Sequence, residues 1–210
     1  NVLMSLDGNR LSLTGTYLEV ELVGRIDVQS EGADGDITVP ARKLVDICKS
    51  LPDGVDISFS VEDGKVTVRA GRSRFTLSTL PAAEFPTVEA GDGEIDLDLA
   101  QPLVRQMIDR TGFAMAQQDV RYYLNGMYLE IKEGRLRFVA TDGHRLALCT
   151  APGQIPVDDK SVIVPRKGIL ELSRLLDGDG SVTLCVGSNH IRAATDQFTF
   201  TSKLVDGKFP

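Results

Sequence analysis

The sequence predicts an α+β protein made of two tandem copies of one domain, each assembled from repeated β-α-β-β-β units with antiparallel sheets. Short apolar alternations separated by Gly- and Asp-containing turns predict many antiparallel strands. Landmarks of the first half also recur in the second: Val39-Pro40 returns as Val164-Pro165, an offset of 125, and Phe85-Pro86 returns as Phe209-Pro210, an offset of 124. A period this long indicates a duplicated domain and not a solenoid.

The first copy is predicted to hold strands on either side of one helix. Pro40–Ser50 predicts the helix, because a proline is well placed to start it and Leu44, Ile47, Cys48 and Leu51 recur on one face. Alternation and turn residues predict the strands. These strands are expected at residues 2–6, 11–13, 18–22, 37–39, 55–61, 65–68 and 73–78.

The second copy is predicted to begin near Gly91 with a strand at 94–99 and a helix at 100–111. Three strands follow within 128–149, then a strand, a helix at 165–175 and three more strands up to residue 203. The counterpart of Asn1 is Asn125, so the first copy lacks the roughly 34 residues that open the second. We therefore expect a domain at 1–90 without its first strand and helix, a complete domain at 91–210, and a core face left uncovered.

Composition limits the class of protein. The chain has 210 residues, 42% of them hydrophobic, and no apolar run approaches the roughly 20 residues that a membrane helix needs. Its three cysteines, Cys48, Cys149 and Cys185, fall in apolar segments far apart in sequence. Buried thiols in a reducing compartment are expected, and with them a cytoplasmic protein.

The net charge of −7 argues against a nucleic-acid partner, but its distribution does not. The three helical segments, 40–50, 100–111 and 165–175, hold eight basic and three acidic residues, a net +5, which leaves −12 for the rest of the chain. A fold that gathers these helices on one side would present a positive surface to a polyanion. On charge alone, solvated basic residues on helix surfaces are the favoured interpretation.

No motif for catalysis, a metal or a phosphate-binding loop stands out. The two histidines, His144 and His190, are far apart, and no cofactor is expected. Asp142 and His144 are the one candidate base and orienter, and they define an alternative function as a small-molecule hydrolase. At positions i and i+2 of a tight turn, however, their side chains are expected to point apart.

The stretch from 119 to 150 is the most specific part of the chain, and with four other segments it carries a resemblance. DVRYYLNGM, VATDGHRLALC, SVIVPRKGILEL, FTSKLVDGKFP and GRSRFTLSTLPAAEFP resemble the bacterial DNA polymerase III beta subunit family of sliding clamps. The resemblance covers all 210 residues. It implies a DNA-clamp fold with helices on one side and sheets on the other, and three such domains per subunit.

The same resemblance implies a non-catalytic processivity factor. Two subunits would close head to tail into a ring around double-stranded DNA and tether polymerase III through its alpha subunit, other polymerases and the clamp loader. No membrane partner is implied. The third domain is expected to be missing from this sequence. The chain alone is then expected to retain little DNA but to bind a partner peptide weakly.

The resemblance assigns three groups of residues. Those matched to DNA contact are Arg42, Lys43, Gln118, Tyr122, Tyr123, Arg166 and Lys167. Those matched to a pocket for a short partner peptide are Leu124, Thr141, Gly143, His144, Arg145, Leu146 and Pro210. Those matched to an edge strand at the dimer interface are Arg72, Arg74, Phe75 and Leu77.

Local physics offers a plainer interpretation of each group. Tyr122-Tyr123 would suit a strand entering the core, with one ring on either face. His144 and Arg145 would suit a turn cap. The strand that holds Phe75 and Leu77 would suit the interior of a sheet, although exposed apolar residues on an edge invite a partner strand.

Overall fold

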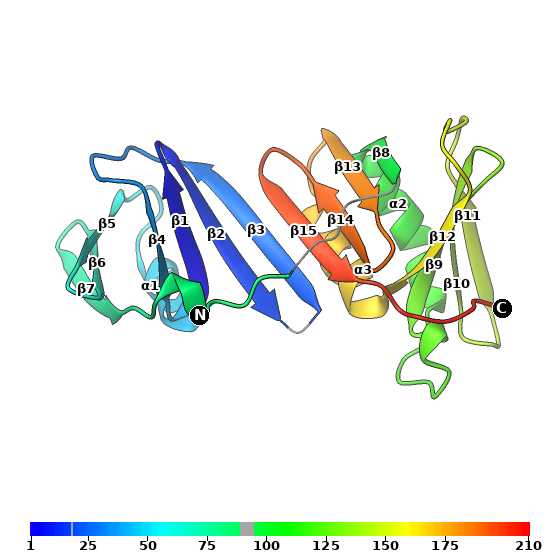
Figure 1. The fold of residues 1–210 in the computed structure, drawn as a ribbon, viewed down its shortest axis with the longest axis horizontal. Coiled ribbons are helices and arrows are strands. Elements are labelled where there is room, and N and C mark those ends of the chain that lie inside the picture. Colours follow the sequence, from blue (N-terminus) through cyan, green and yellow to red (C-terminus); the bar gives the residue numbers. More distant parts are fainter. Residues whose placement is uncertain (18, 89–94) are drawn as a thin grey trace. The chain divides into compact units, whose positions relative to one another are not determined.

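The computed structural model describes residues 1–17, 19–88 and 95–210, which form two compact units. Unit 1 comprises Asn1–Tyr17 and Glu21–Thr87, and unit 2 is formed mainly by Val88–Pro210. Residue 18 of the expected third strand, and residues 89–94, where the second copy is expected to begin, lie outside the described residues. Each unit is described by itself below (Figure 1).

Unit 1 contains two antiparallel sheets and one α-helix. Its elements are β1 (Val2–Asp7), β2 (Arg10–Tyr17), β3 (Val20–Asp27), β4 (Gly35–Val39), α1 (Ala41–Ser50), β5 (Ile57–Glu62), β6 (Lys65–Ala70), β7 (Ser73–Ser78) and the 3-10 turn η1 (Ala82–Glu84). The strand orders are β4-β1-β2-β3 and β5-β6-β7. The predicted helix and strands are present, with β2 and β3 longer than expected.

The core of unit 1 lies between α1 and the two sheets. Leu44 and Ile47 on the helix pack with Met4 of β1 and Val66 and Val68 of β6, all less than 9% exposed. Pro40 precedes the first turn, where its fixed φ and missing N–H suit a helix start. Leu51 lies just beyond the helix and is only partly buried against this core.

Unit 2 contains two complete β-α-β-β-β repeats. The first is β8 (Ile95–Ala100), α2 (Gln101–Thr111), β9 (Gly126–Lys132), β10 (Arg135–Thr141) and β11 (Leu146–Thr150). The second is β12 (Lys160–Pro165), α3 (Arg166–Leu175), β13 (Ser181–Val186), β14 (His190–Ala194) and β15 (Phe198–Lys203). Short 3-10 turns, η2 (Gly112–Ala114) and η3 (Tyr122–Leu124), lie between α2 and β9. The predicted element order is confirmed.

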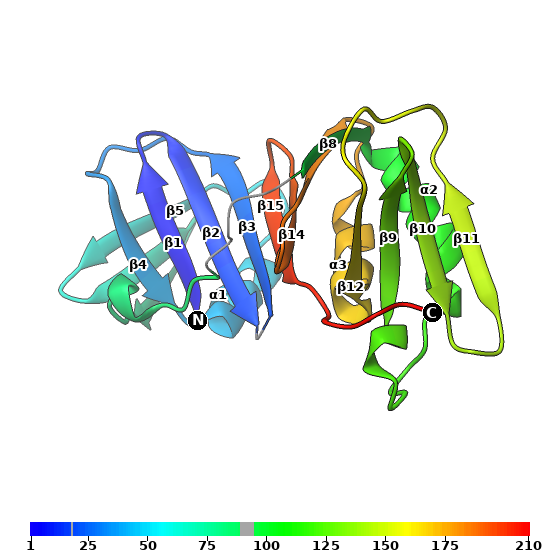
Figure 2. The same cartoon turned by 45° about the vertical axis from the view of Figure 1, so that its right-hand side comes forward.

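The two repeats of unit 2 exchange their first strands. One sheet has the order β11-β10-β9-β12, so the second repeat supplies β12 to the sheet of the first. Conversely, β8 of the first repeat pairs antiparallel with β13 of the second, with Leu97 opposite Leu184. The helices α2 and α3 pack against each other and against these sheets (Figure 2). This doubled arrangement is the α+β fold of repeated β-α-β-β-β units that the sequence predicts.

Unit 1 has no counterpart of β8 and α2 among its described residues, and the packing differs accordingly. Ile57, Phe59 and Val61 of β5 are 36%, 37% and 52% exposed. The residues 125 positions later, Val182, Leu184 and Val186 of β13, are at most 2% exposed. The side chains of β5 are therefore exposed where their counterparts in β13 are buried.

The prediction that all three cysteines are buried is wrong. Cys48 is exposed, because the buried face of α1 consists of Leu44 and Ile47 and the next position turns outward. Cys149 and Cys185 are half-buried on strands. Burial, followed by a hydrogen bond with Asp96, raises the pKa of the Cys185 thiol.

The described helices are short: in that part of the chain, none has the length and apolar character required to cross a membrane. The longest is α2, with 11 residues, whereas a membrane-spanning helix needs about 20.

Strand exchange in unit 2 requires a glycine at position 126. A Cβ atom there would lie 2.6 Å from the carbonyl oxygen of Val164 and 2.9 Å from Cγ2 of Ile163, on the paired strand β12. Gly126→Ala is therefore expected to lower the free energy of unfolding of unit 2 by about 1–3 kcal/mol, measured by chemical denaturation. Gly112→Ala is the matched control, because its nearest neighbour would lie at an ordinary 3.6 Å. Equal stability of the two variants would contradict this packing.

Candidate functional site

The turn between β10 and β11 is held by hydrogen bonds within residues 141–146. The hydroxyl of Thr141 donates to the carbonyl oxygen of Arg145 at 2.7 Å and accepts from the backbone N–H of Gly143 at 3.1 Å. Gly143 has φ = +89°, a conformation that side chains other than glycine rarely adopt. The sequence Thr-Asp-Gly therefore fixes one tight turn, which begins where β10 ends.

Asp142 is used inside this turn. Its Oδ1 accepts hydrogen bonds from the backbone N–H groups of His144 and Arg145, both at 3.0 Å, and its Oδ2 accepts one from Nε of Arg145, also at 3.0 Å. The backbone bonds, to His144 first and then Arg145, hold the pKa of Asp142 below its ordinary value. This carboxylate stabilises a turn, whereas the hydrolase alternative needs it to orient the imidazole of His144.

Arg145 anchors the turn to the segment that follows α2. Its Nη2 donates to the carbonyl oxygen of Phe113 in η2 at 2.9 Å, and its guanidinium lies 5.5 Å from the centroid of the Phe113 ring. Such a contact adds a cation–π attraction to the hydrogen bond. The cap expected by the plainer interpretation is thus present, and it also joins two loops.

The loop from 115 to 125 is closed by hydrogen bonds between its two ends. The side chain of Asn125 accepts from the backbone N–H of Asp119 at 3.0 Å and donates to its carbonyl oxygen at 2.8 Å. The N–H of Ala116 donates to the carbonyl of Leu124 at 3.0 Å. With the loop closed by these hydrogen bonds, the side chain of Val120 lies at the loop tip and is 95% exposed.

Arg121 joins this loop to the Asp142 turn. Its Nε and Nη2 donate to the two carboxylate oxygens of Asp119 at 3.0 and 2.8 Å, and Nη2 also approaches the carbonyl oxygen of Asp142 at 3.3 Å. The side-chain bond from Arg121 is the main reason that the pKa of Asp119 is lowered to about 2. The guanidinium lies over Gly143, where a Cβ atom would be 3.1 Å from both Nη atoms.

The residues matched to the DNA-contacting loop lie along this same segment. Gln118 adopts φ = +56°, and Tyr122 is 58% exposed while Tyr123 is half-buried. The two rings meet edge to face, with centroids 5.9 Å apart. The alternative of a strand is wrong here, because residues 122–124 form the 3-10 turn η3.

The C-terminal segment of the described chain runs beside the same end of the β9–β10–β11 sheet (Figures 1 and 2). Phe209 stacks on Tyr128 of β9 with a centroid distance of 4.8 Å, and Gly207 lies next to Tyr123. Pro210 is exposed at the end of this segment. Residues distant in sequence therefore meet near the Asp142 turn.

The residues matched to the peptide pocket divide into an exposed set and a buried set. Gly143, His144, Arg145 and Leu146 are exposed, and Leu146 is 64% exposed. Thr141 and Leu124 are 7% and 2% exposed, so Leu124 supports the site from the core and is not available at the surface. A hollow of about 530 Å³ lies at the other end of β10, lined by Glu133, Gly134 and residues 154–158, and it includes none of the predicted residues.

The predicted basic residues lie in the first turns of two equivalent helices, and of these residues only Arg42 and Lys167 share a position at the offset of 125. Arg42 and Lys43 are exposed in the first turn of α1, and Arg166 and Lys167 begin α3. Arg166 is half-buried, and its Nη1 donates to the carbonyl oxygen of Met115 at 3.3 Å. The start of α3 is thereby joined to the loop that holds Gln118 and Tyr122.

The predicted dimer strand corresponds to β7, an edge of the sheet β5-β6-β7. Arg74 is exposed on this strand, whereas Arg72 lies in the turn before it. Phe75 is half-buried, and Leu77 is 5% exposed in the core of unit 1. The expectation that Leu77 is exposed is therefore wrong, because its alternation points it toward α1.

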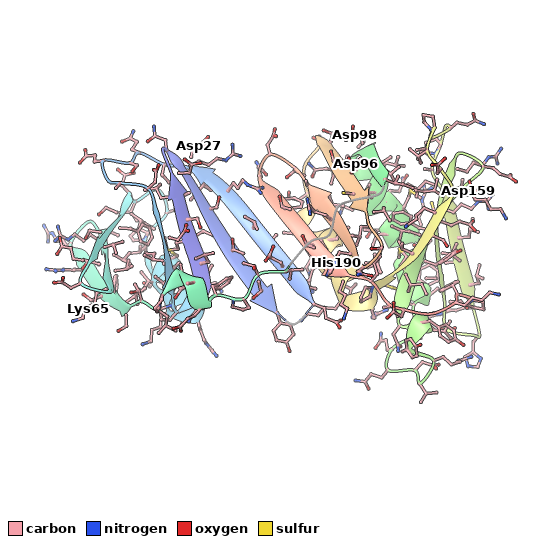
Figure 3. The ribbon with its side chains drawn as sticks, in the orientation of Figure 1. Asp27, Lys65, Asp96, Asp98, Asp159 and His190 are labelled. Atoms are coloured by element: carbon pink, nitrogen blue, oxygen red, sulfur yellow. The ribbon has the colours of Figure 1, made fainter. Side chains whose placement is uncertain are left out.

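Sequence reasoning missed the residues that hold the site together. Arg121 and Phe113 contact the Asp142 turn, and Asp119 and Asn125 hold the loop that carries Arg121. Asp and Asn next to a turn are the only signals available in the sequence, since both side chains commonly bond nearby backbone groups. His190 lies on β14, in the other sheet from the Asp142 turn (Figure 3).

Comparison with known protein families identifies two adjacent domains. Residues 1–89 match the model of the DNA polymerase III beta subunit, N-terminal domain. Residues 98–210 match the model of the DNA polymerase III beta subunit, central domain.

Individual proteins give the same result. The whole chain is 65% identical to the beta sliding clamp of Pseudomonas aeruginosa and 51% identical to that of Escherichia coli K12, and it covers 58% of each. A crystal structure of the Pseudomonas aeruginosa DNA polymerase III subunit beta superimposes with a TM-score of 0.96 at 64% identity, over 100% of this chain and 58% of that one. Another, of the clamp bound to griselimycin, gives 0.96 at 65% identity over 100% of this chain and 57% of that one.

Acid is expected to loosen the two joined loops. Asp119 and Asp142 both have pKa values below the unfolded-state value of 3.8. Their contribution to stability is therefore complete above pH 3.8 and is lost as the pH falls through the folded-state pKa, which for Asp119 is about 2. Titration of the carboxyl resonances by NMR should give values below 3.8 for both. Arg121→Gln should return the pKa of Asp119 toward its ordinary value. An unchanged pKa in this variant would contradict the assignment.

Proposed function

The chain belongs to the DNA polymerase III beta subunit family, and from this premise we propose that the protein containing it is a sliding clamp. The clamp is a ring that encircles double-stranded DNA and tethers a replicative polymerase to its template. Residues 1–90 and 91–210 are its first and middle domains, and a third domain completes each subunit of a head-to-tail dimer. The support is the repeated clamp fold together with basic first turns at equivalent positions of α1 and α3.

DNA contact in this proposal involves the phosphate backbone. Arg42, Lys43, Arg166 and Lys167 provide positive charge at the helix starts, and the loop with Gln118, Tyr122 and Tyr123 adds polar and aromatic contacts. Contacts with phosphates carry no information about base sequence. They also release counterions and weaken as salt rises. A ring that slides along any sequence requires this behaviour.

The partner peptide is proposed to bind at the Asp142 turn. Leu146 offers an exposed apolar side chain, Gly143 allows close approach to backbone, and Arg145 lies at the rim with His144. Thr141 and Leu124 are buried and support these exposed residues from the core. Pro210 lies on the C-terminal segment, which runs beside them. Polymerase subunits and the clamp loader are the proposed sources of the peptide, with an apolar side chain as its anchor.

Dimer formation is proposed to use the free edge of β7. Strands at the edge of a sheet present unpaired backbone groups that another chain can complete. Arg74 and the turn residue Arg72 are exposed at this edge. Phe75 and Leu77 act from the core side and fix the position of the strand.

The proposed clamp is a processivity factor and performs no chemical step itself. Asp142 is engaged with backbone N–H groups and Arg145, which fits a binding turn better than a hydrolytic base. No cofactor is needed for a topological tether. Because the proposed clamp acts on the bacterial chromosome, its proposed location is the cytoplasm.

The ring predicts that retention depends on DNA topology. Full-length protein loaded on a nicked circular plasmid should stay bound during gel filtration, even in salt that disrupts phosphate contacts. Cutting the plasmid once should release it, because the ring runs off free ends. The same retention on circular and linear DNA would contradict a clamp.

The peptide site predicts a strong effect at Leu146. Leu146→Asp should weaken binding of a fluorescein-labelled peptide with leucine and phenylalanine anchors by about fivefold or more, since the loss of a central apolar contact commonly costs about 1 kcal/mol or more. Fluorescence anisotropy measures this affinity. Leu80→Asp is the control, because Leu80 is also exposed, at 53%, but belongs to unit 1. Equal affinities of the two variants would contradict the site.

A further inference from the structure

One side chain, Arg121, contacts both of the surfaces to which the proposed function assigns ligands. It belongs to the loop proposed to touch DNA, between Gln118 and Tyr122. It also lies over the turn proposed to bind peptide, with Nη2 3.3 Å from the carbonyl oxygen of Asp142. Arg121 itself is not among the residues assigned above to DNA contact, the peptide pocket or the dimer interface.

The position of Arg121 is set by Asp119, and Asp119 is itself fixed. Two bonds to the carboxylate, at 3.0 and 2.8 Å, hold the guanidinium in a paired geometry. The backbone of Asp119 is held from both sides by Asn125. Charge-assisted paired bonds of this kind are directional, so they determine where the guanidinium lies. The guanidinium is therefore held directly over Gly143.

Arg121 is nevertheless accessible to a competing anion. Its side chain is 46% exposed, so a phosphate can approach it from solvent. A phosphate offers a guanidinium the same paired acceptor geometry as a carboxylate. Exposed ion pairs such as Arg121–Asp119 contribute little net stability, so a competing phosphate has little to overcome.

We propose that Arg121 is a positioning residue that couples the two ligand sites, so that DNA bound at the loop weakens peptide binding at the Asp142 turn. When a phosphate draws the guanidinium away from Asp119, the contact with the Asp142 carbonyl is lost. Gly143 then loses the group that lies over it. The turn becomes less ordered before the peptide arrives, and its affinity falls.

The coupling is reciprocal by thermodynamic necessity. If bound DNA lowers the affinity for the peptide by some factor, bound peptide lowers the affinity for DNA by the same factor. This rests on the proposed function for the identity of both ligands, but the pathway itself is a set of contacts within unit 2. Arg145, which joins the same turn to Phe113, does not reach the loop at Asp119 in the contacts described.

The test measures peptide affinity with and without DNA. Full-length protein is titrated with the labelled leucine–phenylalanine peptide, alone and with a saturating primed duplex. The dissociation constant should rise about fivefold or more with DNA for the unsubstituted protein, the lower end of typical coupling between sites. For Arg121→Gln it should be the same with and without DNA. Arg121→Lys should restore part of the effect, since it retains the charge but not the paired geometry.

Arg137→Gln is the matched control. Arg137 also pairs with a carboxylate, Glu130, at 3.1 Å, but on the adjacent strands β10 and β9 and away from both loops. In Arg137→Gln, DNA should raise the dissociation constant of the peptide by the same factor as in the unsubstituted protein. The ratio of the two dissociation constants is the readout, because a general loss of stability would change both values and leave their ratio unaltered.

The outcomes separate the two levels of the proposal. Equal peptide affinities with and without DNA in the unsubstituted protein would overturn the coupling and leave the clamp intact. A DNA effect that persists in Arg121→Gln would overturn the role of Arg121. Failure of the unsubstituted protein to bind either ligand would contradict the proposed function and, with it, this inference.

Discussion

The exchange of first strands between repeats is the constraint on which the rest of unit 2 depends. Because β8 pairs with β13 and β12 pairs with β9, neither sheet is complete without a strand from the other repeat. Each helix follows an exchanged strand directly, so the exchange places α2 and α3 side by side. Gly126 permits the close approach of β9 to β12. The basic residues at the start of α3 owe their position to this pairing, because Pro165 is both the last residue of β12 and the residue before the helix.

Much of this architecture could be predicted because the signals are local or repeated. Pro40 and Pro165 mark helix starts by their fixed φ, and Gly134 and Gly143 mark turns by their tolerance of positive φ. Because the sequence repeats, a helix or strand predicted in one copy also predicts its counterpart in the other. The prediction failed where neighbours distant in sequence decide burial. Cys48 shares an apolar periodicity with Ile47, yet only the packing of α1 on its sheets shows which of the two is buried.

The candidate site was predictable in its residues but not in its connections. The motif from 119 to 150 indicated Gly143, His144 and Leu146 through resemblance, and local chemistry indicated a turn. That Arg121 reaches the Asp142 carbonyl, or that Arg145 lies over Phe113, depends on loop geometry that no periodicity encodes. Two surfaces with different proposed ligands are thus joined by a few polar side chains. The proposed coupling between these surfaces requires no movement of the sheets.

In the proposed ring, the basic first turns of repeated helices face DNA. Lysine modification of the full-length protein, bound to circular DNA and free, tests it most directly by mass spectrometry. Lys43 on α1 and Lys167 on α3 should become protected from acetylation when DNA is present, whereas Lys65 on β6 should react equally in both states. If Lys43 and Lys167 kept their full reactivity on DNA, the helices would not face it, which would contradict the proposed ring.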